Sequence, residues 1–103
     1  MSKKVYISGP MQGIEDFNYP AFNQAERELK EAGFVVINPT RHPEGLEYEQ
    51  YMQYAMLDVE ICDIVMLLPN WTGSPGAKRE AKKAYSLDKS VFTVDAFLRE
   101  FGL

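Results

Sequence analysis

Short apolar runs alternate with stretches whose apolar residues recur at helical spacing along the whole chain. The runs lie at residues 3–8, 34–37, 64–68 and 90–94, and they predict four buried strands. Helical spacing predicts helices over 20–32, 47–61 and 75–87, and a short closing helix that Asp95 caps.

Four alternations of strand and helix predict a parallel sheet with right-handed crossovers and helices on both faces. We therefore expect an α/β fold: a single Rossmann-like (flavodoxin-like) domain over residues 1–103, with a four-stranded parallel sheet of order 2-1-3-4. The inward helical positions that the spacing predicts are Phe22, Ala25, Leu29 and Ala32; Tyr48, Tyr51, Met52, Ala55, Met56 and Val59; and Ala77, Ala81, Ala84 and Leu87.

The chain is organised around the stretch from Cys62 to Leu87, which reads as a buried strand, a polar loop and a helix. Ser74 followed by Pro75 suits an N-cap hydroxyl with proline at the first helical position. Helical side chains lean toward the N-terminus of their helix. The carboxylate of Glu80 is therefore expected near the mouth of the strand–helix junction.

A second turn-rich loop follows the first strand and runs from Ser8 to Gly13. Its spacing matches neither the dinucleotide fingerprint nor a P-loop, but its glycines permit close approach of a ligand. In a sheet of order 2-1-3-4, ligands bind where the first and third strands end. We expect this loop, the loop before Ser74, and Asn38 to border one crevice.

The expected crevice combines three kinds of chemistry. Backbone donors and Ser74 at a helix N-terminus favour an anion such as phosphate. Aromatic surface, expected from Trp71 with Tyr6 or Phe17, suits a planar base. Glu80, kept ionised by the helix dipole and nearby basic side chains, suits attack on an anomeric carbon. The alternative is a surface glutamate that pairs with Lys83.

Composition narrows the function classes. With 15 acidic against 11 basic residues, the chain has a net charge of −4, which argues against a nucleic-acid polymer as partner. One cysteine (Cys62) and one histidine (His42, expected on the surface) make a metal site improbable, and we expect no cofactor. The lone cysteine and the absence of a long apolar run predict a cytoplasmic protein.

Taken together, several motifs resemble the nucleoside 2-deoxyribosyltransferase-like superfamily. They are the run from Tyr6 to Gly13, the step Asn38-Pro39, Cys62-Asp63 before an apolar strand, and Leu68-Pro69-Asn70-Trp71 followed by Ser74-Pro75-Gly76-Ala77 and Glu80. The resemblance covers nearly the entire chain, and the motifs keep their order and spacing. The greatest similarity is to small members of about this length, many of them from phages and bacteria.

The resemblance implies roles for individual residues. Glu80 would attack C1′ of a deoxynucleoside or deoxynucleotide, and Ser74 would contact a 5′-phosphate. The loop after the first strand would lie against the nucleotide. The substrate-binding residues that we expect are Tyr6, Ser8, Gly9, Pro10, Met11, Gln12, Gly13, Asn38, Trp71, Ser74 and Gly76.

The chain departs from the superfamily pattern at three positions. Gln12 stands where the nucleotide-hydrolysing branch has arginine, and Lys82 stands where glycine is common. Ala55 stands where active members place a helical aspartate, and Asp58, one turn further on, is expected to face differently.

We expect an enzyme that cleaves an N-glycosidic bond or transfers a deoxyribosyl group, a nucleoside 2-deoxyribosyltransferase or deoxynucleotide N-hydrolase, acting on a small nucleoside or nucleotide. The alternative, which Ala55 favours, is a catalytically inactive module that binds or sequesters nucleotides. The dense tyrosines and methionines of the second helix predict a homodimer.

Overall fold

Four parallel strands form one sheet in the order β2-β1-β3-β4, which confirms the predicted fold class and strand order. The structure, a computed structural model, describes residues 2–103. The strands are β1 (Lys4–Ser8), β2 (Val35–Ile37), β3 (Ile64–Leu67) and β4 (Ser90–Thr93). The helices are α1 (Tyr19–Glu31), α2 (Tyr48–Ile61), α3 (Pro75–Ser86) and α4 (Val94–Phe101), with short 3-10 turns η1 (Glu15–Asn18), η2 (Pro39–Arg41) and η3 (Trp71–Gly73).

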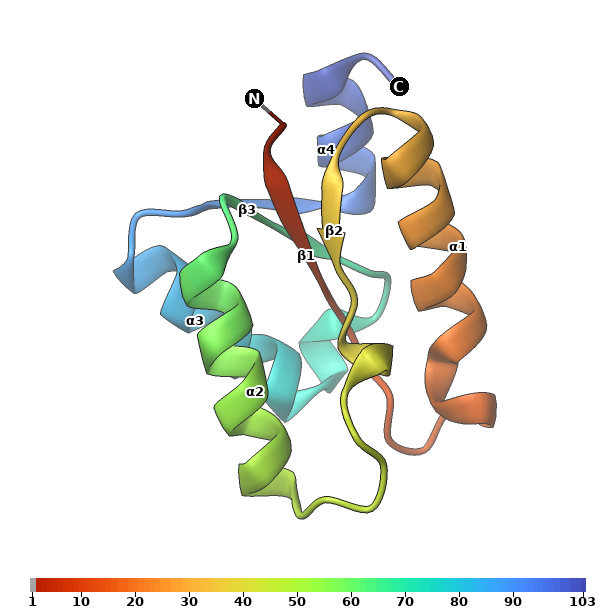
Figure 1. The fold of residues 1–103 in the computed structure, drawn as a ribbon, viewed down its shortest axis with the longest axis vertical. Helices are drawn as coiled ribbons and strands as arrows, with labels where there is room; N and C mark the ends of the chain where they lie inside the picture. Colours follow the sequence, from red (N-terminus) through yellow and green to blue (C-terminus); the bar gives the residue numbers. More distant parts are fainter. Residues whose placement is uncertain (1) are drawn as a thin grey trace.

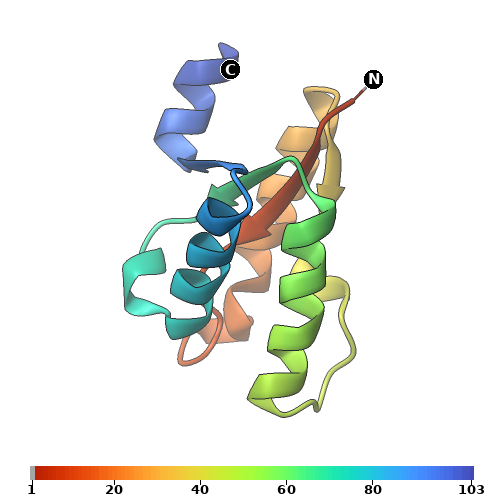
Figure 2. The same cartoon turned by 90° about the vertical axis from the view of Figure 1, so that its left-hand side faces the viewer.

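The helices cover both faces of the sheet, α1 and α4 on one face and α2 and α3 on the other (Figure 1). Successive strand residues point to opposite faces, so Val5 and Ile7 pack toward α1 whereas Tyr6 packs toward α2 and α3. The start of β1 and the end of α4 lie at one end of the molecule, and the loops after β1 and β2 lie at the other (Figure 2).

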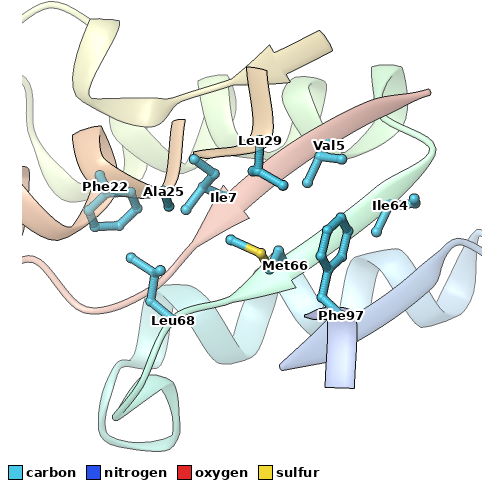
Figure 3. Packing of buried hydrophobic residues seen from close by; sticks show 9 residues of the cluster. All are labelled: Val5, Ile7, Phe22, Ala25, Leu29, Ile64, Met66, Leu68 and Phe97. Carbon is cyan, nitrogen blue, oxygen red and sulfur yellow. The ribbon is translucent and has the colours of Figure 1, made fainter. Parts of the chain in front are cut away.

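The larger hydrophobic cluster fills the space between the sheet, α1 and α4 (Figure 3). Phe97 of α4 is fully buried and its ring lies 5.3 Å from that of Phe34 and 4.6 Å from that of Phe101, centroid to centroid. The buried members of the cluster are Val5, Ile7, Phe22, Ala25, Leu29, Ile64, Met66, Leu68 and Phe97. No helix formed by residues 2–103 has the length and apolar character that a membrane span needs.

The structure corrects five details of the predicted helices. Ala32 and Leu87 are exposed because each follows the last helical residue, in the turn that leads into the next strand. Tyr48 and Tyr51 of α2 are also exposed rather than packed in the core. The closing helix is capped by the Thr93 hydroxyl, which accepts the Ala96 N–H at 3.3 Å, so α4 begins earlier than an Asp95 cap would allow.

The chain holds β1 and β3 together beyond their last paired residues. The Leu68 N–H donates to the Ser8 carbonyl at 2.8 Å. A side chain at Gly9 would place its Cβ 2.8 Å from the Leu68 Cβ, so only glycine permits this approach without a local shift. The loops that follow the two strands are therefore fixed side by side at their start.

Candidate active site

A cavity of about 800 Å³ opens where β1 ends, between the loops after β1 and β2 and the facing ends of α2 and α3. This volume is within the range of small-molecule sites. Its walls are formed by Tyr6, Gly9, Pro10, Met11, Gln12, Phe17, Tyr19, Pro39, His42, Glu44, Gly45, Tyr48, Tyr51, Met52, Ala55, Gly73, Ser74, Pro75, Gly76, Ala77 and Glu80.

Glu80 projects from the second turn of α3 into this cavity wall. The helix begins as its sequence predicts, with Pro75 at its start and the Ala77 N–H donating to the Ser74 hydroxyl at 3.2 Å. The side chain of Glu80 is buried, with 8% of the residue exposed. The Ser8 hydroxyl, at the end of β1, donates to Glu80 Oε1 at 2.6 Å.

Burial raises the pKa of Glu80 from its ordinary value of 4.5 to about 7. Hydrogen bonds from Ser8 and Tyr6 lower this pKa in part, and the nearby Asp58 carboxylate raises it further. The expectation that Glu80 is held ionised by the helix start and adjacent basic residues is therefore wrong. Desolvation outweighs those charges, because Arg79 points to solvent and binds Glu49 at 2.9 Å.

The alternative of a surface glutamate paired with Lys83 is also wrong. Lys83 Nζ lies 3.4 Å from Glu60 Oε1 on α2, and Glu80 turns inward to Ser8. Glu80 is therefore a buried carboxylate at a cavity wall.

The raised pKa of Glu80 predicts a pH-dependent stability. The Glu80 carboxyl ionises near pH 4.5 in the unfolded chain and near pH 7 in the folded chain. The free energy of unfolding therefore falls as the pH rises between these two values. Glu80→Gln removes this cost. Between pH 4 and pH 9 the free energy of unfolding of the variant, relative to the parent, should therefore rise by up to about 3 kcal/mol.

Urea denaturation of both proteins across this pH range measures the effect. Glu60→Gln, which alters an exposed acid on α2, is the matched control and should show no such trend. A difference between Glu80→Gln and the parent that stays constant with pH would contradict the buried, proton-binding state of Glu80.

His42 is a cavity residue that the sequence placed wrongly on the surface. Its Nε2 lies 2.6 Å from Asp58 Oδ2 on α2, and each of the two side chains is only 14% exposed. The His42 ring also packs against Tyr54, with centroids 4.7 Å apart. Burial lowers the pKa of His42 and raises that of Asp58 to about 6. A contact this short requires a proton between the two atoms.

Seven of the predicted substrate-binding residues lie on the cavity wall, together with Glu80. They are Tyr6, Gly9, Pro10, Met11, Gln12, Ser74 and Gly76. Ser8 is fully buried behind the wall and does not line the cavity; it contacts Glu80 through a hydrogen bond.

Gly13, Asn38 and Trp71 do not line the cavity. Gly13 turns the loop away with a φ of +77°. Asn38 is buried and structural: its side chain accepts the Thr40 N–H and donates to Asn23, both at 3.0 Å. Trp71 packs against the hydrophobic cluster between the sheet, α2 and α3.

The aromatic surface of the cavity comes from residues other than Trp71. Phe17 of η1 and Tyr19 at the start of α1 contribute to it, together with Tyr48 and Tyr51 from the first turn of α2. Tyr48 and Tyr51 follow the helical spacing of the buried Met52 and Ala55, which is why spacing alone assigned them to the core, but both are exposed. Their density at the start of one helix is the signal that could have indicated a ligand surface.

No group of three or more histidine, cysteine, aspartate or glutamate side chains that could hold a metal occurs within residues 2–103.

Solved structures that share this fold include two enzymes by name. The "2-desoxiribosyltransferase" of Leishmania mexicana superposes with a TM-score of 0.71 at 22% identity, over 88% of this chain and 63% of that one. The "CMP N-glycosidase, BcmB" of Clostridium botulinum superposes with a TM-score of 0.65 at 19% identity, over 88% of this chain and 67% of that one. This chain thus spans less than two thirds of the length of the first. The fold expected from the resemblance is confirmed.

In sequence, no curated protein matches the chain. A family model described as "Domain of unknown function (DUF4406)" matches residues 3–93, which is most of its length. The chain therefore belongs to the DUF4406 family.

Proposed function

We propose that the cavity cleaves or exchanges the N-glycosidic bond of a nucleoside or nucleotide, with Glu80 as the nucleophile. The observation that carries the proposal is the buried Glu80 carboxylate, which accepts a hydrogen bond from Ser8 and lies on the wall of an aromatic-lined cavity. Aromatic rings stack on a planar base, and a carboxylate stabilises or attacks an anomeric carbon. The two proteins of similar fold, named as a deoxyribosyltransferase and an N-glycosidase, support this class of chemistry.

In the first step a Glu80 oxygen bonds to C1′ as the C1′–N bond breaks, and the base leaves with the bonding electron pair. In the second step water or another base attacks C1′ and releases the Glu80 carboxylate. A pKa of about 7 leaves a substantial ionised fraction at neutral pH and keeps the carboxylate poorly solvated. The hydrogen bond from the Ser8 hydroxyl to Oε1 orients the carboxylate.

The His42–Asp58 pair supplies proton transfer in this scheme. Because Nε2 is held by Asp58, Nδ1 is the ring nitrogen left to meet a ligand. The imidazolium donates a proton to the departing base, and neutral His42 accepts one from the water or base that enters. The Asp58 carboxylate orients the ring and stabilises the imidazolium, as a carboxylate does for catalytic histidines in general.

The experiment that tests the proposed function is release of free base. The protein is incubated with the common deoxynucleosides and their 5′-monophosphates, and free base is measured by chromatography. We expect release from at least one of them. No release from any substrate, with or without a second base as acceptor, would contradict the proposal.

One observation favours a second function, a module that binds nucleotides without reacting. Ala55 presents a methyl group to the cavity and is only 5% exposed, so the α2 wall carries no carboxylate there. Calorimetric binding of a nucleoside or nucleotide without base release would support this function over catalysis.

We further propose that the protein works as a homodimer in a reducing cytoplasm, where its one cysteine stays unpaired. Tyr54, Leu57 and Ile61 lie along one side of α2 and are 42%, 53% and 48% exposed, which leaves an apolar strip for a second copy. Sedimentation velocity should show a dimer that Leu57→Glu dissociates. A parent protein that stays monomeric at high concentration would contradict the proposal.

A further inference from the structure

The charge of the cavity wall is acidic. The titratable acids on the wall are Glu44, from the loop after β2, and Glu80, from α3. Asp58 stands behind His42 and is close enough to raise the pKa of Glu80. No lysine or arginine within residues 2–103 forms part of this wall. A ligand that brings further negative charge therefore meets repulsion from these acids, and the described part of the wall offers it no lysine or arginine side chain.

Arg79 and Arg41, which stand next to cavity residues in the sequence, are both paired with carboxylates that do not line the cavity. The Arg79 guanidinium donates to Glu49 at 2.9 Å and lies 5.6 Å above the Tyr48 ring. Arg41 of η2 is bound to Glu26 of α1. Each of these cations is already paired with a carboxylate, so recruiting it to a ligand would break an existing ion pair.

The start of α3 also has few donors to offer an anion. Pro75 has no N–H, the Ala77 N–H donates to the Ser74 hydroxyl at 3.2 Å, and the Lys78 N–H donates to the Ser74 carbonyl at 3.0 Å. Only the Gly76 N–H is left in the first turn. Helix starts that hold phosphate present several free amides at once.

We propose that the cavity takes uncharged nucleosides in preference to nucleoside 5′-phosphates. This inference rests on the proposed function and names its substrate class. The aromatic rings and methionines of the wall hold the base, and Glu44, Gln12 and Ser74 offer hydrogen bonds to sugar hydroxyls. A carboxylate accepts a hydrogen bond from a hydroxyl, whereas it repels a phosphate.

The test compares matched pairs that differ only in the 5′-phosphate. Each of the four common 2′-deoxynucleosides and its 5′-monophosphate is assayed for base release at low salt, where charge effects are least screened. We expect kcat/KM for the preferred nucleoside to exceed that for its monophosphate by at least about tenfold. An equal or higher value for the monophosphate overturns the inference and leaves the proposed function standing.

A variant that adds one positive charge to the cavity tests the cause of the preference. Gln12 is exposed at the rim and lines the cavity, so Gln12→Lys places a cation there. We expect this change to lower the ratio of kcat/KM for the nucleoside to kcat/KM for its monophosphate severalfold. Gln24→Lys, an exposed position on α1 whose amide binds Glu28, adds the same charge away from the cavity and should leave the ratio unchanged. Equal effects of both variants would overturn the electrostatic cause.

If no substrate releases its base, calorimetry with the same pairs separates the two claims. Tighter binding of the nucleoside then supports the inference although the proposed catalysis has failed. Tighter binding of the monophosphate, or no binding of either compound, overturns the inference.

Discussion

Replacing Glu80 with glutamine should lower base release by about a thousandfold or more. Glutamine keeps the size of the side chain and can still accept the hydrogen bond that Ser8 donates at 2.6 Å. It cannot form the bond to C1′ on which the proposed reaction depends. Nucleoside binding should stay within a few fold of the parent, because the rest of the cavity wall is untouched.

The matched control for this variant is Glu60→Gln. Glu60 lies on α2, half exposed and paired with Lys83 at 3.4 Å, and it is not part of the cavity wall. The control should release base at the rate of the parent. A Glu80→Gln protein that turns over as fast as the parent would show that Glu80 is not the nucleophile.

Replacing His42 with glutamine should lower base release from a natural nucleoside by about a hundredfold. The amide cannot transfer a proton, although it can still bond to Asp58. The loss should nearly vanish for the first turnover of 4-nitrophenyl 2-deoxyriboside, because nitrophenolate leaves without being protonated. Rapid-mixing absorbance for this compound and chromatography for the nucleoside measure the two effects.

Comparing the two leaving groups distinguishes proton transfer from a structural role. Arg41→Gln changes the preceding residue, whose side chain binds Glu26 away from the cavity, and should alter neither rate. Equal losses for both leaving groups in His42→Gln would mean that His42 only holds Asp58 and α2 in place.

The placement of Glu80 could be predicted because it depends on local rules. Ser74 and Pro75 set the start of α3, and the helical lean of side chains brings a carboxylate in the second turn toward the sheet edge. The order of strands then follows from their alternation with helices, and it brings Ser8 of β1 to the same edge. Each step needs only neighbouring residues or a general rule of topology.

The protonation of Glu80 could not be predicted, because it depends on how residues distant in sequence exclude water. Lys78 and Arg79 are adjacent along the chain but face solvent, whereas Ser8, Tyr6 and Asp58 determine the surroundings of the carboxylate. The surface expectation for His42 failed for the same reason. Its loop has turn residues and no periodic pattern, and only the fold shows that it packs on Asp58 and Tyr54.

Trp71 illustrates a different limit. A tryptophan in a polar loop beside the expected crevice can turn toward the ligand or toward the core, and the sequence is the same in both cases. In the structure the ring packs on the cluster that contains Val65 and Ala81. The tyrosines of α2 supply the aromatic wall instead.

The covalent step is the central claim, and intact-protein mass measures it most directly. The protein is mixed with the nucleoside that releases base fastest, quenched in acid within one turnover, and analysed by mass spectrometry with peptide mapping. We predict the added mass of one deoxyribosyl group on Glu80, absent from Glu80→Gln. Base release without this adduct, or an adduct on another residue, would contradict the role assigned to Glu80.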